Sequence, residues 1–335
     1  MFFYGPISDK IGRRKVVLFG LSVYLICSLL ITETSSISGF LVLRLIQGIG
    51  AGVGPTLAIV IIMEYFSKDR VGKIISICSL VFLSSPLFVP FIGGYIQEHL
   101  GWQYNFLFLT VLAAIALITY YFCCPETNLK FSTEKLSIIK ALQIYWNIFK
   151  DNISRTCLFA MAFVYSTYMV FPTLGPFLYQ IEYKFSPVHF GILCLVISLG
   201  AIPSKLLYPS ISKRFSHRAL FYCGATLILL SSVALFVCAM FFAINPYMIV
   251  LLIACVTFSA NIFTPILTTS ALLRFESNKG AAGSLYSGLA MMMTAGIIAL
   301  LSHLPDDTPV YLSSAYFILA ISIFCLSLCY FKLSD

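Results

Sequence analysis

Four cations and one acid lie close together near the start of the sequence. They belong to the segment Gly5-Pro-Ile-Ser-Asp9-Lys-Ile-Gly12-Arg13-Arg14-Lys15. Gly and Pro at this density predict a turn that ends one helix and begins the next. An apolar run, residues 16–31, follows directly, and cations beside such a run are typical of the cytoplasmic anchor between two membrane spans. The chemistry that this segment offers is ion pairing.

A second polar group, Arg44 with Gln47 and Gly48, lies inside an apolar segment. Helical spacing places these three residues on one face. An arginine at membrane depth is costly, so it should face a wet cavity or an acidic partner. The alternative is an arginine whose side chain extends to the membrane surface, because Arg44 is only about 9 Å from the outer end of its helix by helical rise.

Further candidates for binding or motion lie in three other apolar segments. Pro86 and Pro90, one turn apart, remove backbone donors and predict a kink, and Gly93 and Gly94 predict close packing of a neighbouring helix. Aromatic and amide side chains could line a cavity for a lipophilic ligand, and plain packing or lipid contact is the alternative. The candidates for this lining are Tyr165, Tyr168 and Asn261.

The composition argues against an enzyme and against a nucleic-acid partner. Of 335 residues, 60% are hydrophobic and 10% are charged. The net charge of +8 comes from cations in short loops between apolar segments, which is a topology signal rather than a nucleic-acid surface. The eleven cysteines show no metal-ligand spacing, and the four histidines lie near the ends of apolar segments without paired acids. Neither a metal site nor a catalytic pair is predicted, and no cofactor.

Apolar stretches near 20 residues recur to the C-terminus and predict an all-α polytopic membrane protein. Nineteen of the 21 Lys and Arg residues fall on one side of the predicted spans, which makes that side cytoplasmic; Lys184 alone falls on the other side. The ten predicted spans are residues 16–31, 38–66, 72–96, 104–124, 154–181, 188–208, 219–243, 247–273, 281–302 and 311–331.

A weak internal repeat divides the chain into two helical bundles. Residues 4–14 align without gaps on residues 208–218, and both copies lie in a basic loop between two spans. We expect an N-terminal bundle over 1–124, a central cytoplasmic loop over 125–153 and a C-terminal six-helix bundle over 154–335. The second copy is preceded by one span and most of another. By comparison, the first bundle is expected to lack its first helix and most of its second.

Several of these motifs resemble one family of membrane transporters. The spacing G-x-x-x-D-x-x-G-R-R-K in residues 5–15 resembles the signature loop of the major facilitator superfamily. R-x-x-Q-G-x-G-A from Arg44 resembles the fourth-helix motif of its proton-linked members, and Pro86 with Pro90-Phe-Ile-Gly-Gly94 resembles the fifth-helix antiporter motif. Gly101-Trp-Gln-Tyr104 and Pro125-Glu-Thr127 resemble the Bcr/CflA drug-resistance branch in particular.

This resemblance implies a fold of two six-helix bundles and a conformational latch between them. In the family, Arg13 would pair with an acid at the end of the fourth helix, here Glu64. Asp9 would face the start of a later helix, here residues 279–283, where the free N–H groups favour a carboxylate. Arg44 would lie near the cavity and tune protonation or contact the substrate. Gly5, Gly12 and Arg14 complete the predicted latch.

The function implied is proton-driven efflux of drugs or other lipophilic small molecules, by a monomer in the bacterial inner membrane. Its partners would be the substrate, protons and the lipid bilayer. Exporters of siderophores or metabolites, and solute symporters, are alternatives within the superfamily. No Asp or Glu lies mid-membrane in this sequence, and in the resembled branch that acid is commonly in the first helix. A non-functional truncated remnant is therefore a further alternative, and sequence upstream of Met1 would discriminate.

Overall fold

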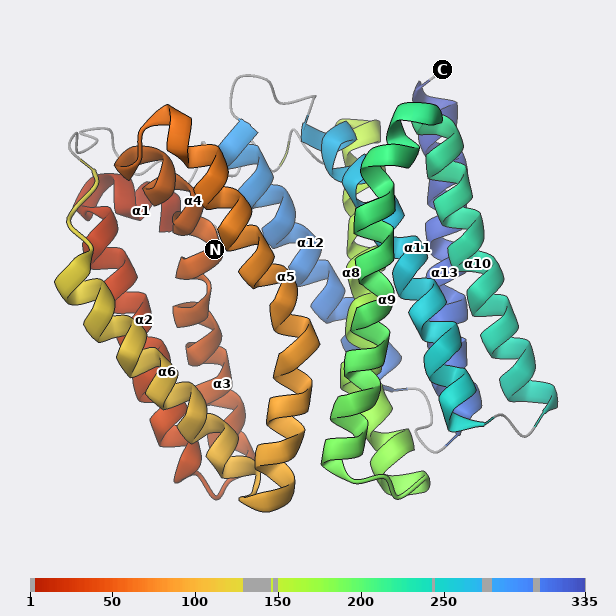
Figure 1. Ribbon diagram of the computed structural model, residues 1–335, viewed down its shortest axis with the longest axis horizontal. Helices are drawn as coiled ribbons and strands as arrows, with labels where there is room; N and C mark the ends of the chain where they lie inside the picture. Colours follow the sequence, from red (N-terminus) through yellow and green to blue (C-terminus); the bar gives the residue numbers. More distant parts are fainter. Residues whose placement is uncertain are drawn as a thin grey trace. The chain divides into compact units, whose positions relative to one another are not determined.

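The computed structural model describes residues 4–128, 146, 150–242, 245–272, 279–303 and 308–334, and these residues form helices joined by short turns (Figure 1). The first half contains α1 (Tyr4–Ile11), α2 (Arg13–Thr32), α3 (Ile37–Ala51), α4 (Val53–Tyr65), α5 (Lys68–His99) and α6 (Trp102–Cys123). The second half contains α8 (Asn152–Pro176), η1 (Phe177–Glu182), α9 (Pro187–Arg214), α10 (His217–Phe241), α11 (Pro246–Leu272), α12 (Lys279–Leu301) and α13 (Pro309–Ser334).

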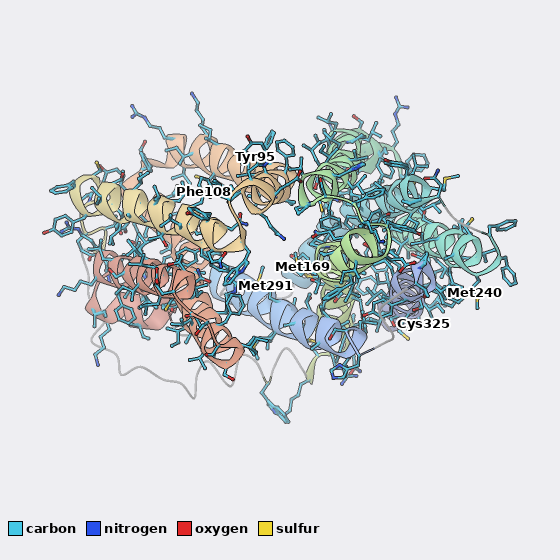
Figure 2. The ribbon with its side chains drawn as sticks, turned by 90° about the horizontal axis from the view of Figure 1, so that it is seen from below. Tyr95, Phe108, Met169, Met240, Met291 and Cys325 are labelled. Atoms are coloured by element: carbon cyan, nitrogen blue, oxygen red, sulfur yellow. The ribbon has the colours of Figure 1, made fainter. Side chains whose placement is uncertain are left out.

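Eight helical segments within the described residues are long and apolar enough to cross a membrane. They correspond to eight of the ten predicted spans. The other two predicted spans, 72–96 and 281–302, coincide with α5 and α12, whose side chains lie partly outside the described residues. Large apolar side chains such as Phe108 and Met240 are exposed, as lipid-facing helices require (Figure 2). The prediction of an all-α polytopic membrane protein is confirmed.

The chain separates into two compact units. Unit 1 contains residues 1–85 and 95–141, and unit 2 contains residues 86–94 and 142–335. The predicted central loop, 125–153, lies mostly outside the described residues. The domain boundaries derived from the repeat therefore stay a prediction.

The charged segment at the start of unit 1 is more helical than its Gly and Pro content predicts. We expected a turn over this segment, but α1 runs from Tyr4 through Asp9 to Ile11. Pro6 lies within α1, whose described part begins at Tyr4, so Gly5-Pro6 does not end the helix. The chain breaks at Gly12 instead, where φ is 101°, a value that side-chain-bearing residues rarely adopt.

The predicted span 38–66 consists of α3 and α4, which meet at Gly52; the backbone of Gly52 is itself helical, with φ −65° and ψ −15°, so the two helices form one span. Against it, α2 crosses α3 very closely. A Cβ added to Gly50 would lie 2.6 Å from the carbonyl oxygen of Gly20 and 2.8 Å from the backbone nitrogen of Tyr24. This close approach of Gly20 and Gly50 holds the later residues of α2, Ser28 among them, against the face of α3 that carries Gln47.

Unit 2 has a continuous apolar core, to which α8 contributes the most buried surface. Leu158 and Leu174 of α8, Phe263 of α11 and Tyr316 of α13 are almost completely buried within one cluster. Pro172 and Pro176 lie inside the last turns of α8, and the helix continues as the π-helical turn η1. Tyr179 of this turn is fully buried, and its hydroxyl donates to the carbonyl oxygen of Pro246 at 2.6 Å.

Candidate functional site: the polar network around Arg13

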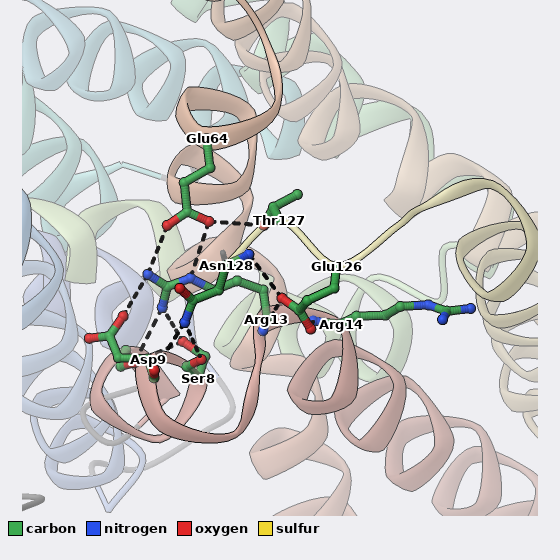
Figure 3. A network of polar contacts seen from close by, with 9 residues as sticks. Ser8, Asp9, Arg13, Arg14, Glu64, Glu126, Thr127 and Asn128 are labelled. Atoms are coloured by element: carbon green, nitrogen blue, oxygen red, sulfur yellow. Dashed lines mark hydrogen bonds and ion pairs between the residues drawn. The ribbon is translucent and has the colours of Figure 1, made fainter. Parts of the chain in front are cut away.

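Arg13 is the centre of a polar network at one end of unit 1 (Figure 3). Only 7% of the residue is exposed. Its Nη2 lies 2.6 Å from Asp9 Oδ1 and 3.0 Å from Glu64 Oε1, and its Nε donates to Glu64 Oε2 at 3.4 Å. Its Nη1 donates to the hydroxyl of Ser8 and to the carbonyl oxygen of Gly5. The five donors of a guanidinium fit such a dispersed set of oxygens.

The local folding of three helices brings these groups together. Asp9 and Arg13 are four residues apart on either side of the Gly12 break, which turns α2 so that the Arg13 side chain reaches back over α1. Glu64 arrives from the last turn of α4. Asp9 remains about half exposed, with 47% of its side chain accessible, against 29% for Glu64. The two carboxylates therefore differ in how easily each can leave Arg13.

The segment after α6 completes the network. Glu126 accepts hydrogen bonds from the backbone N–H groups of Arg13 at 2.8 Å and Arg14 at 3.1 Å. These are the first N–H groups of α2, which have no partner inside the helix, and a carboxylate is favoured there by the helix dipole. Thr127 donates to Glu64 Oε2 at 2.9 Å, and Asn128 donates to the carbonyl oxygen of Asp9 at 2.9 Å. Residues 126–128 thus tie α1, α2 and α4 to the end of α6.

Arg14 points away from Arg13 and contacts α6. Its Nη2 donates to the carbonyl oxygen of Tyr121 at 2.6 Å, and its guanidinium carbon lies 5.3 Å from the centre of the Tyr121 ring. The two neighbouring arginines therefore have different partners: Arg13 binds carboxylates, and Arg14 binds an aromatic residue at the end of a neighbouring helix.

All six predicted latch residues take part in this network or border it, Arg14 through its backbone N–H, which donates to Glu126. Gly5, Asp9, Arg13 and Glu64 are joined in it through side chains or backbone, and Gly12 supplies the break between α1 and α2. The predicted contact of Asp9 with residues 279–283 involves side chains outside the described residues. The function of the group as a conformational latch stays a prediction.

The second candidate group, around Arg44, lies on the face of α3 that meets α2. Arg44 Nη1 donates to Gln47 Oε1 at 2.6 Å, and Gln47 Nε2 donates to the hydroxyl of Ser28 on α2 at 2.6 Å. Gln47 is 1% exposed, whereas Arg44 is exposed and lies 5.7 Å from the centre of the Phe106 ring. A Cβ added to Gly48 would meet nothing within 4 Å. The sequence predicts a wet cavity or an acidic partner for Arg44. The contacts described above are with two neutral side chains, Gln47 and Phe106.

The remaining candidates lie in unit 2. The kink residues Pro86, Pro90, Gly93 and Gly94 belong to α5, which is one uninterrupted helix, and the side chain of Pro86 is outside the described residues. Gly94 is so close to the carbonyl group of Pro187 that a Cβ would clash with it. A Cβ on Gly191 would likewise lie 2.8 Å from the carbonyl oxygen of Pro90. Close packing is therefore present at Gly94, and the role of this segment in antiport stays a prediction.

The predicted lining residues are partly buried and their polar atoms are used locally. The hydroxyl of Tyr168 lies 3.4 Å from that of Thr264, and Asn261 Nδ2 donates to the carbonyl oxygen of Thr257 at 2.9 Å. Tyr165 packs against the apolar core. A role in lining a cavity stays a prediction for all three. Within the described residues, no group of three or more His, Cys, Asp and Glu residues could hold a metal ion.

The sequence analysis missed four members of the Arg13 network: Ser8, Glu126, Thr127 and Asn128. Pro125-Glu-Thr127 had been noted only as a branch motif. The available signal was a carboxylate, Glu126, directly after an apolar span. Such a group can accept hydrogen bonds from the first N–H groups of another helix. This signal predicts that the carboxylate caps a helix, but it does not predict that the helix is α2.

The all-helical polytopic fold, with helices long and apolar enough to cross a membrane, defines the class of helical membrane proteins. Within that class, this chain belongs to the Major Facilitator Superfamily, whose sequence profile matches residues 1–302. The predicted resemblance is confirmed, and with it the prediction of a transporter-family protein rather than an enzyme.

Named relatives and a solved structure agree with this assignment. Over 189 residues the chain is 30% identical to a bicyclomycin resistance protein homolog of Haemophilus influenzae, covering 56% of this chain and 48%, about half, of that protein. It is 26% identical to multidrug resistance protein D of Escherichia coli over 91% of this chain and 76% of that one. The crystal structure of a D-xylose-proton symporter matches 99% of this chain and 83% of its own, with a TM-score of 0.72 at 16% identity, and shows the shared fold.

Proposed function

We propose that this chain exports lipophilic small molecules, drugs among them, in exchange for protons across the plasma membrane of a bacterium. The Arg13 network would lie on the cytoplasmic side, where the count of cations places it. The observation that carries the proposal is the network itself, because it joins three helices and the segment after α6 through charged groups at a single point.

The network has the properties that a latch for alternating access needs. Arg13 keeps Glu64 as a partner within unit 1, while Asp9 is about half exposed and can exchange Arg13 for another partner at small desolvation cost. Such an exchange would alter the ends of α1 and α2 together, because Glu126 and Asn128 bind both sides of the Gly12 break. A bistable contact of this kind is a recognised basis of switching transitions.

The substrate class rests on the relatives. Two of them are named for resistance to bicyclomycin and to multiple drugs. Arg44 supplies a fixed positive charge beside the buried pair Gln47–Ser28, where it would tune the protonation of an acid or contact the substrate. Replacing Arg44 by Gln removes this charge and keeps a side chain that can bond to Gln47.

Dye accumulation in cells tests the proposal. Cells producing this chain should accumulate less ethidium than cells with an empty vector, and a protonophore should abolish the difference. Arg13→Gln should restore accumulation and Arg44→Gln should remove the protonophore effect. Lys15→Gln, which removes an exposed cation of the same segment, should leave export unchanged. Equal accumulation with verified membrane insertion would refute export. Raised accumulation would identify uptake instead.

A further inference from the structure

The end of unit 1 opposite the Arg13 network contains a pocket of about 250 Å³. It lies between the α2–α3 turn and the beginning of α6, at the bottom of Figure 1. Its lining residues are Thr34, Ser35, Ser36, Ile37, Phe40 and Trp102. The pocket is open to its surroundings on one side, and its volume has room for a molecule of one or two rings.

The walls of this pocket offer apolar surface and no charge. The hydroxyl of Thr34 donates to the carbonyl oxygen of Leu30 at 2.8 Å, and the hydroxyl of Ser36 accepts from the backbone N–H of Gly39 at 3.1 Å. Both hydroxyls are therefore engaged within the chain. None of the six lining residues is ionised, so the pocket favours a neutral ligand over an ion.

Two aromatic rings of the pocket, Phe40 and Trp102, pack against each other and against Phe106, which lies outside the lining. The centres of the Phe40 and Trp102 rings are 6.0 Å apart at 80°, and those of Phe40 and Phe106 are 5.7 Å apart at 89°. Trp102 and Phe106 are 6.0 Å apart at 84°. Edge-to-face contacts of this kind are favourable and fix ring orientation. Trp102 is still 41% exposed, which leaves part of its indole available to a ligand.

We propose that this pocket, called here the Trp102 pocket, binds planar, neutral aromatic small molecules as a second site on the transport path. The link to the path is Phe106, whose ring contacts both Phe40 of the pocket and the guanidinium of Arg44. This assignment rests on the proposed function, because the direction of transport decides whether the site is used on entry or on exit. An aliphatic occupant such as a lipid chain would gain nothing from the orientation of the rings.

Tryptophan fluorescence tests the pocket directly, because the chain has two tryptophans, Trp102 and Trp146. Trp146→Phe in the full chain leaves Trp102 as the single reporter. The probe is 4-nitrobenzyl alcohol, a planar neutral nitroaromatic that quenches indole fluorescence on contact. In the purified protein we expect quenching of Trp102 that saturates with probe concentration. Trp102→Phe, which reports on Trp146 alone, should show quenching that rises without saturation.

Two variants at Ser35 are the matched controls. Ser35→Phe, made with Trp146→Phe, fills the pocket and should weaken the apparent affinity about tenfold or more, because the added ring occupies the ligand volume. Ser35→Ala should leave it unchanged. Cyclohexylmethanol, of similar size without a ring face, should not protect Trp102. Non-saturating quenching of Trp102, equal quenching in Ser35→Phe, or protection by cyclohexylmethanol would each overturn the assignment.

The two proposals fail separately. Saturable quenching in a chain that does not lower ethidium accumulation would refute export and leave the Trp102 pocket as a binding site. Ethidium export by a chain whose Trp102 quenching does not saturate would refute the pocket and leave the proposed function intact.

Discussion

Inside each of the two units, a different kind of contact holds the helices together. In unit 2 a single cluster of buried apolar side chains runs through α8, α9, α10, α11 and α13. In the described part of unit 1 the corresponding cluster is small and consists of Val16, Val17, Val53 and Leu57. Unit 1 instead has the Arg13 network at one end, the polar contact of Gln47 with Ser28, and the close glycine crossing of α2 and α3.

This difference predicts different sensitivities to mutation in the two units. Inside a membrane, helices associate through close packing and polar bonds, because lipid offers no hydrophobic gain for helix contact. A tightly interlocked apolar core has one favourable arrangement. A charged network has several, since each carboxylate can pair with another cation. We therefore expect unit 2 to be sensitive to side-chain volume, and unit 1 to be sensitive to charge and to the shape of its glycine crossing.

The largest expected loss of unfolding free energy comes from making a cavity in the core of unit 2. Phe263 is fully buried, and its ring centre lies 4.4 Å from that of Phe221. Phe263→Ala should lower the free energy of unfolding by about 3–5 kcal/mol. Thermal unfolding of the purified protein in detergent measures this. Leu206→Ala on α9 is the control, because Leu206 is 73% exposed and should cost little. Equal unfolding temperatures for the two variants would contradict the picture of a tightly packed core.

Charge removal at Arg13 should have the next largest effect. Arg13→Gln leaves Glu64 and Asp9 without their cation and should cost about 3 kcal/mol, as expected for breaking a largely buried ion pair. Arg13→Lys keeps the charge but not the planar fork, so it should recover part of the stability and less of the export. Thermal unfolding, with Lys15→Gln as control, measures the stability of each variant, and the dye-accumulation assay measures its export. A full recovery of both by Lys would show that the charge suffices without the geometry.

Helix type and membrane character could be predicted from the sequence, because apolar runs of span length are a strong and local signal. The pairing of Arg13 with Glu64 was also available, through the likeness of residues 5–15 to a family loop. The position of the helix break was not. Gly5-Pro6 carries the stronger turn signal, yet both residues lie within α1 and the break falls at Gly12.

Contacts between distant segments account for most of what the sequence did not predict. Glu126 caps α2 from more than a hundred residues away, and Asn128 reaches back to Asp9 over a similar separation. No periodicity records such contacts. The junction of α3 and α4 at Gly52 is hidden for another reason: glycine lowers helix propensity only slightly, and this segment has several. For Arg44, spacing placed Gln47 on the same face of the helix but did not predict that the two side chains share a hydrogen bond.

The glycine crossing of unit 1 gives an intermediate effect that needs no charge. Gly50→Ala places a methyl group 2.6 Å from the carbonyl oxygen of Gly20, and the backbones must separate to admit it. We expect a loss of about 1–3 kcal/mol in the free energy of unfolding. Gly54→Ala is the matched control, because a Cβ there meets nothing within 4 Å and alanine favours the helix. If both alanines were equally harmless, close packing of α2 on α3 would not be what holds unit 1.

The smallest expected effect separates a cap from an ion pair. Glu126 accepts from the backbone N–H groups of Arg13 and Asn128 through Oε1 and from that of Arg14 through Oε2, so Glu126→Gln keeps one acceptor oxygen, replaces the other by an NH2 group and removes the charge. We expect a loss of about 1 kcal/mol in unfolding free energy, the usual contribution of a charge at a helix start. Combined with Arg13→Gln, which leaves the backbone N–H in place, the two losses should nearly add. A strongly non-additive double variant would show instead that Glu126 acts through the guanidinium, and that the network in unit 1 responds as one unit.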